Sequence, residues 1–124
     1  QENALKIDST NTQILYSYAE FFHESDPLLA LSTYHKIILL DPAYKDAFLN
    51  SGILYFSIDS FAQALQHFDI ACHQSPTEPT YYYYRGIAKE AINDIEGARS
   101  DYNQALQLDA NYTEAKKALE KLGQ

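Results

Sequence analysis

A set of small and large residues recurs along this chain at one fixed spacing. The recurring pairs are Gly52 and Gly86, Ala64 and Ala98, Phe68 and Tyr102, and Ala71 and Ala105, and each pair differs in residue number by the same amount (86 − 52 = 34). A repeat period of about 20 to 50 residues is typical of supersecondary units that stack on one another, because one unit alone cannot bury its apolar face. The chain is therefore expected to form a stack in which each unit packs against its neighbours.

Apolar residues within each unit recur at helical spacing, and Pro residues mark where helices end or begin. Pro is tolerated in the first turn of a helix and not in its interior. Asp26-Pro27, Asp59-Ser60 and Asn93-Asp94 are typical of capped turns between the two helices of a unit. The sequence predicts helices over residues 12–24, 27–40, 43–57, 60–74, 79–92, 95–108 and 112–122.

The sizes of the repeated residues indicate how these helices pack. Gly52, Gly86 and Ala19 are small and allow two helices to approach closely, whereas Phe68 and Tyr102 are large and fill the remaining space. The combination of period, residue size and helix breaks resembles the tetratricopeptide repeat. The resemblance implies an all-α fold, a right-handed α-solenoid of three helix-turn-helix repeats closed by a C-terminal capping helix.

The resemblance divides the chain into repeats over residues 11–44, 45–78 and 79–112 and a capping helix over residues 113–124. Residues 1–10 are interpreted either as the end of a preceding repeat or as a frayed tail.

The first repeat departs from the regular spacing. Its second half aligns with the next repeat at the regular period, as Ala30 does with Ala64, whereas its first half aligns one residue short of it, as Ala19 does with Gly52. One residue is therefore expected to be missing from the turn around Ser25-Asp26-Pro27, where a solenoid accommodates a deletion most easily.

Charge and motif content exclude several classes of function. Seventeen acidic residues against nine Lys and Arg give a net charge of −8, with no basic stripe for a nucleic acid backbone. No apolar stretch approaches the roughly 20 residues of a membrane-spanning helix, so direct membrane insertion is not expected. Metal-ligand, phosphate-loop and nucleophile motifs are absent, and the single Cys72 is interpreted as a structural thiol. We therefore expect no enzyme activity, no cofactor and no metal ion.

In proteins with this repeat, the ligand usually lies in a concave groove lined by the first helix of each unit. The resemblance assigns nine groove positions here: Tyr16, Glu20, Leu49, Asn50, Ile53, Phe56, Tyr83, Tyr84 and Ile87. Some members of the family grip the C-terminal carboxylate of heat-shock chaperones at five positions, which here hold Tyr16, Glu20, Asn50, Thr80 and Tyr84. Only Asn50 agrees with that clamp, and Glu20 would repel a carboxylate. The sequence therefore argues against a chaperone-tail ligand.

Four consecutive tyrosines, Tyr81 to Tyr84, point in four directions on a helix, because neighbouring residues are about 100° apart. Tyr81 and Tyr82 are expected to pack internally, and Tyr83 and Tyr84 to be exposed toward the groove. Clustered aromatic residues are typical of recognition surfaces. The alternative is that these tyrosines only cover neighbouring helices.

Together these features favour a non-catalytic scaffold or adaptor that binds a protein or peptide partner with apolar or aromatic anchors. Acidic groups at Glu20, Asp46 and Glu90 should favour basic residues beside those anchors. Two alternatives stay open: a self-associating segment of a longer repeat array, and the docking module of a larger multidomain protein. Repeat scaffolds are most often cytoplasmic, which favours that compartment. A chain without Met also suits a protein exported after removal of a leader.

Overall fold

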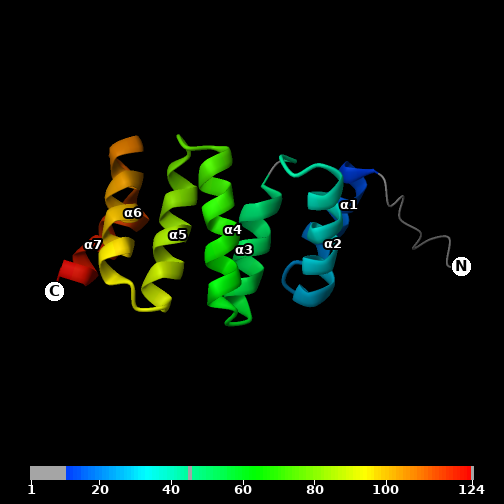
Figure 1. The fold of residues 1–124 in the computed structure, drawn as a ribbon, viewed down its shortest axis with the longest axis horizontal. Coiled ribbons are helices and arrows are strands. Elements are labelled where there is room, and N and C mark those ends of the chain that lie inside the picture. The colour runs from blue at the N-terminus through cyan, green and yellow to red at the C-terminus, as the bar shows by residue number, and fades with distance from the viewer. Residues whose placement is uncertain (1–10, 45, 124) are drawn as a thin grey trace, which may run out of the picture.

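The computed structural model describes residues 11–44 and 46–123, and over these residues the chain forms α-helices and no strand. The helices are α1 (Thr12–Phe22), α2 (Pro27–Leu40), α3 (Ala47–Ser57), α4 (Phe61–Gln74), α5 (Pro79–Ala91), α6 (Ile95–Leu108) and α7 (Thr113–Gly123). Figure 1 shows them side by side in an elongated row that ends with α7. Each helix packs mainly against its neighbours in the chain, which defines an α-solenoid of helix-turn-helix pairs. The interpretations of residues 1–10 lie outside the described residues.

The start of α3 differs most from the prediction, since the other predicted helix ends lie within two residues of the observed ones. This helix begins at Ala47 instead of residue 43 because Asp41 holds the residues that follow it, Ala43 and Tyr44, in a turn. The Asp41 side chain accepts a hydrogen bond from the Ala43 amide at 3.3 Å, and its carbonyl accepts one from the Tyr44 amide at 3.0 Å. Short Asp side chains compete with helix formation in this way.

The turns within the second and third helix pairs share one backbone feature. Asp59 and Asn93, at equivalent positions of the two pairs, have φ angles of 64° and 70°, in the left-handed region that Asp and Asn tolerate best among residues with side chains. The described part of the α1–α2 turn has no such residue. Pro27 starts α2 eight residues after Ala19 (27 − 19), whereas α4 starts nine residues after Gly52 (61 − 52). This difference agrees with the predicted loss of one residue in the first turn.

Three aromatic residues at equivalent positions, Tyr34, Phe68 and Tyr102, belong to three successive apolar clusters and are almost completely buried. Burying such a ring contributes about 1.5–3 kcal/mol. A Cβ atom at Gly52 would lie 2.5 Å from Cε1 of Phe68, and one at Gly86 would lie 2.6 Å from Cε1 of Tyr102. The repeated glycines are therefore required by the rings that pack over them.

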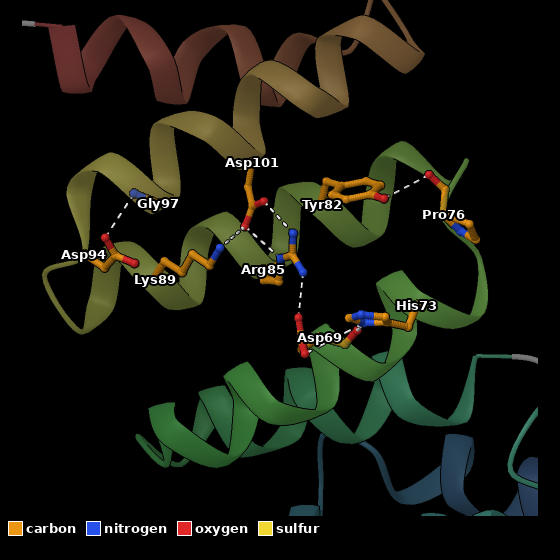
Figure 2. A network of polar contacts seen from close by, with 9 residues as sticks. All are labelled: Asp69, His73, Pro76, Tyr82, Arg85, Lys89, Asp94, Gly97 and Asp101. Atoms are coloured by element: carbon orange, nitrogen blue, oxygen red, sulfur yellow. Dashed lines mark hydrogen bonds and ion pairs between the residues drawn. The ribbon is translucent and has the colours of Figure 1, made fainter.

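A network of charged residues joins α4, α5 and α6 (Figure 2). The guanidinium group of Arg85 donates two hydrogen bonds of 2.9 Å to the Asp101 carboxylate and one of 2.6 Å to Asp69. The Lys89 ammonium lies 3.1 Å from Asp101. Arg85 occupies the position equivalent to the buried Ser51, so the third unit uses an ion network where the second has a small hydroxyl residue.

Candidate protein-binding groove

Three hollows follow one another along α1, α3, α5 and α7, and we call the surface that contains them the groove face. The N-terminal hollow, about 530 Å³, is lined by Tyr16, Glu20, Phe21, His23, Glu24, Tyr34, Asp46 and Asn50. The middle hollow, about 250 Å³, is lined by Phe56, Ile87, Glu90 and Ala91. The C-terminal hollow, about 390 Å³, is lined by Tyr83, Ile87, Glu90, Tyr102, Glu114, Lys117, Ala118 and Lys121. The middle and C-terminal hollows share Ile87 and Glu90, so they adjoin. Other hollows lie on α6 and beside Cys72.

The N-terminal hollow brings together three of the predicted site residues. Tyr16 and Glu20 stand one helical turn apart on α1, because residues four apart share a face of a helix. The side-chain amide of Asn50 on α3 donates a 2.8 Å hydrogen bond to the Tyr16 hydroxyl. Burial raises the pKa of Tyr16, and the nearby Glu20 carboxylate raises this pKa further, so the phenol stays protonated at neutral pH.

Tyr34 of α2 also lines the N-terminal hollow, although sequence reasoning did not assign it to the site. Its side chain is 0% exposed, and its ring meets the Tyr16 ring edge-on at 5.9 Å. The Tyr34 hydroxyl is buried and has no hydrogen-bond partner among the described residues. A buried polar atom without a partner lowers the stability of the folded state by about 1–3 kcal/mol. The available signal was a hydroxyl group at a position where the next unit has Phe68.

The middle of the groove face is apolar. Ile53, Phe56 and Ile87 are half-buried, and the Phe56 ring packs against the Phe61 ring at 4.9 Å. Leu49, which was also expected on this surface, is only 8% exposed and belongs to the core cluster around Phe68. Leu49 therefore offers little surface to a ligand, because its position on α3 points toward the neighbouring helices.

The four consecutive tyrosines separate as the helical geometry requires. Tyr81 is buried and donates a hydrogen bond to Asp46, the residue before α3, and Tyr82 donates one of 3.0 Å to the Pro76 carbonyl. Tyr83 and Tyr84 are half-buried instead of fully exposed, since their rings pack against each other at 5.5 Å.

Further rings cover parts of both side chains. Tyr83 contacts Tyr102 and Tyr112, and Tyr84 contacts Phe68. Both tyrosines therefore support neighbouring helices, while Tyr83 also lines the C-terminal hollow.

The C-terminal hollow carries charges of both signs. Glu90 accepts a 2.8 Å hydrogen bond from the Tyr102 hydroxyl, which fixes the carboxylate between α5 and α6. Lys117 and Lys121 of α7 line the same hollow. Burial raises the pKa of Tyr83, and the Glu114 carboxylate adds to this rise.

The described residues contain no cluster of three or more His, Cys, Asp or Glu side chains that could hold a metal ion. Cys72 is buried, and burial raises the pKa of its thiol to about 11, which disfavours the nucleophilic thiolate. None of the helices in the described part of the chain combines the length and apolar character needed to cross a bilayer.

Comparison with known proteins gives consistent relatives, although no family model matches the chain. RNA polymerase II-associated protein 3 of Mus musculus is 29% identical over 99% of this chain and 19% of its own length. The first tetratricopeptide repeat domain of Spaghetti (RPAP3), solved with the HSP90 peptide SRMEEVD, superposes with a TM-score of 0.86, at 27% identity and 94% coverage of both chains. The first such domain of human RPAP3 superposes with a TM-score of 0.83, at 26% identity, over 93% of this chain and 91% of that domain.

The helix pairs and the hollowed face define this protein as an α-solenoid of helix-turn-helix repeats. The chain belongs to the tetratricopeptide repeat family. It spans about a fifth of the length of the Mus musculus relative that it matches.

Proposed function

We propose that this domain is a non-catalytic interaction adaptor that binds an extended or short helical peptide segment along the groove face. The observation that carries the proposal is the row of hollows from α1 to α7 with an apolar middle. Phe56 and Ile87 line the middle hollow, and Tyr83 and Ile87 line the C-terminal one. Half-buried aromatic and aliphatic side chains in hollows are the usual anchoring points for a partner's apolar residues.

The bound peptide of the Spaghetti domain supports this mode of binding and also suggests a difference in ligand. Three of the last four residues of that peptide, SRMEEVD, are acidic. In this chain the five clamp positions hold Tyr16, Glu20, Asn50, Thr80 and Tyr84. We infer that the partner segment carries basic residues instead, since Glu20, Asp46 and Glu90 place negative charge along the groove face.

The test is selection of peptides from a random displayed library on the wild-type domain, followed by calorimetry with a selected peptide. Phe56→Ala and Ile87→Ala should each weaken binding by about tenfold, because each truncates an apolar wall of the middle hollow. Leu39→Ala is the matched control, because this apolar side chain is 85% exposed on α2 and lines none of the three hollows. Equal affinity of all three variants would place the peptide elsewhere, and circular dichroism shows that each variant is folded.

A second candidate is a role as part of a longer or self-associating repeat array. Phe21 on α1 is 77% exposed, whereas the residues at the equivalent positions of α3 and α5, Leu54 and Ala88, are buried by the preceding helix pair. Phe21 therefore occupies the position that, in the second and third units, is covered by another helix pair. Sedimentation velocity over a range of concentrations separates the two: a constant monomer mass supports the adaptor, and a rising mass supports self-association. Docking within a larger protein is tested by the full-length sequence.

A further inference from the structure

The N-terminal hollow is lined almost entirely by hydrogen-bond acceptors and aromatic rings. Glu20, Glu24 and Asp46 contribute three exposed carboxylates. The ion pairs found among the described residues involve none of these three groups. Its lining contains no Lys or Arg, and His23 is the one basic side chain in it. Carboxylates gathered in a concave site with low-dielectric walls concentrate negative potential there.

A second and independent observation is Tyr34, which lines the hollow and whose buried hydroxyl lacks a hydrogen-bond partner among the described residues. Buried polar atoms in native proteins are nearly always paired, so an unpaired one in the wall of a hollow is a place where a ligand group can supply the missing partner. A hydroxyl oxygen accepts hydrogen bonds. The ligand group that satisfies it beside three carboxylates is therefore a donor.

Aromatic rings complete the hollow. Tyr16 packs edge-on against Tyr34, and the largely exposed Phe21 stands beside them on α1. A cation over the face of such rings is attracted by their quadrupole, and the attraction increases when water is excluded. The side-chain amide of Asn50 donates to the Tyr16 hydroxyl, and Asn50 also carries a carbonyl oxygen that can accept a hydrogen bond.

We propose that the N-terminal hollow binds one basic side chain, the ammonium group of Lys or the guanidinium group of Arg, from the peptide on the groove face. This inference rests on the proposed function and adds the chemistry and the place of one contact. Glu20 and Glu24 pair with the cation, the Tyr34 hydroxyl accepts one of its N–H bonds, and Tyr16 and Phe21 flank it. The arrangement also gives the bound segment a polarity, since the opposite end of the groove face carries Lys117 and Lys121.

The test is a titration of the isotope-labelled domain, followed by amide NMR, with N-acetylarginine amide, N-acetyllysine amide and the neutral N-acetylglutamine amide. Either cationic probe should shift resonances of Glu20, Glu24 and Asn50, and the glutamine probe should leave them unchanged. The two cationic arms distinguish guanidinium from ammonium as the preferred group. Equal shifts by the neutral probe, or no shift at these residues with either cation, overturn the proposal.

Variants make the assignment specific. Glu20→Gln and Tyr34→Phe should each lower the affinity for the cationic probe by about tenfold, because each variant loses one hydrogen bond to a charged group. Glu96→Gln on α6 is the control for loss of one negative charge outside the hollow and should bind as wild type does. Tyr34→Phe removes an unpaired hydroxyl, so its melting temperature should not fall, which separates the loss of binding from misfolding. Full probe affinity in both variants overturns the proposal.

The library experiment separates this inference from the proposed function. A selected peptide that depends on Phe56 and Ile87, lacks basic residues and binds Glu20→Gln at full strength leaves the groove in place and removes the cation site. Specific binding of the cationic probes without any selected peptide supports the cation site and contradicts the peptide groove.

Discussion

Arg85 donates two parallel N–H···O hydrogen bonds of 2.9 Å each to Asp101, from Nε to Oδ2 and from Nη2 to Oδ1. This fork geometry matches a planar guanidinium group to a carboxylate and is among the strongest polar contacts in proteins. The Asp101 side chain is 4% exposed and that of Arg85 is 17% exposed. The pair therefore fixes α6 against α5 inside the third unit.

The first prediction concerns this pair. Asp101→Ala should lower the free energy of unfolding by about 2–3 kcal/mol, because it leaves Arg85 and Lys89 without their shared carboxylate. The loss stays below the upper range of about 5 kcal/mol for buried pairs, since water can reach Arg85. Urea unfolding measures the change. Asp69→Ala, at the half-exposed end of the network, should cost under about 1 kcal/mol. Equal losses in the two variants would contradict this ranking.

The second prediction concerns the contact between the repeated glycines and aromatic rings. Gly52→Ala should destabilise the domain by about 1–3 kcal/mol, although alanine favours helices, because the added Cβ atom meets the buried Phe68 ring at 2.5 Å. Thermal unfolding followed by circular dichroism measures the effect. Gly123→Ala, where an added Cβ meets nothing within 4 Å, is the control and should be neutral. A stabilised Gly52→Ala protein would show that Phe68 can move aside.

The third prediction is a loss of stability in mild acid caused by His67. Its ring packs near His35, Phe48 and Tyr55 between α2, α3 and α4. Burial lowers the pKa of His67 below 6.5, the neighbouring His35 contributes to this lowering, and a hydrogen bond with the Gln63 carbonyl opposes it. Since the folded pKa lies below the unfolded one, this contribution to stability is present above pH 6.5 and is lost as the pH falls through the folded pKa.

Unfolding midpoints measured in urea from pH 7.5 down to about 5 test this dependence, in the range where an ordinary His titrates. His67→Gln should flatten the profile relative to wild type, because it removes the buried imidazole. Identical profiles for wild type and His67→Gln would contradict the prediction.

The fourth prediction concerns the ligand of the Spaghetti domain. The peptide SRMEEVD should bind this domain at least about a hundredfold more weakly than a selected basic peptide. Its acidic residues would meet the carboxylates of the N-terminal hollow, which repel them and attract a basic residue. Calorimetry at low and physiological salt measures both affinities. Comparable binding of the two peptides would show that the acidic residues of the groove face do not discriminate.

Much of the fold could be predicted because its signals are local or periodic. The contact between Gly52 and Phe68 recurs between Gly86 and Tyr102. Pro27 and Pro79 mark the first turns of α2 and α5. The start of α3 was placed too early because the turn after Asp41 depends on side-chain hydrogen bonds that periodicity does not reveal.

The candidate site was less predictable because it combines residues from several helices. The family resemblance assigns Leu49 to the groove, yet the cluster around Phe68 buries it. Tyr34 was not predicted as a site residue, although it lines the N-terminal hollow. The Arg85 network was missed as well, since the unit before it has Ser51 at that position and the repeat pattern carries no charge there.

Peptide binding along α1, α3 and α5 can be observed directly in an amide NMR map of the domain with a library-selected peptide. Binding along these helices should perturb Glu20, Asn50, Phe56, Tyr83 and Ile87, in a continuous path along the groove face. Perturbations confined to the outer surfaces of α2, α4 and α6 would contradict it.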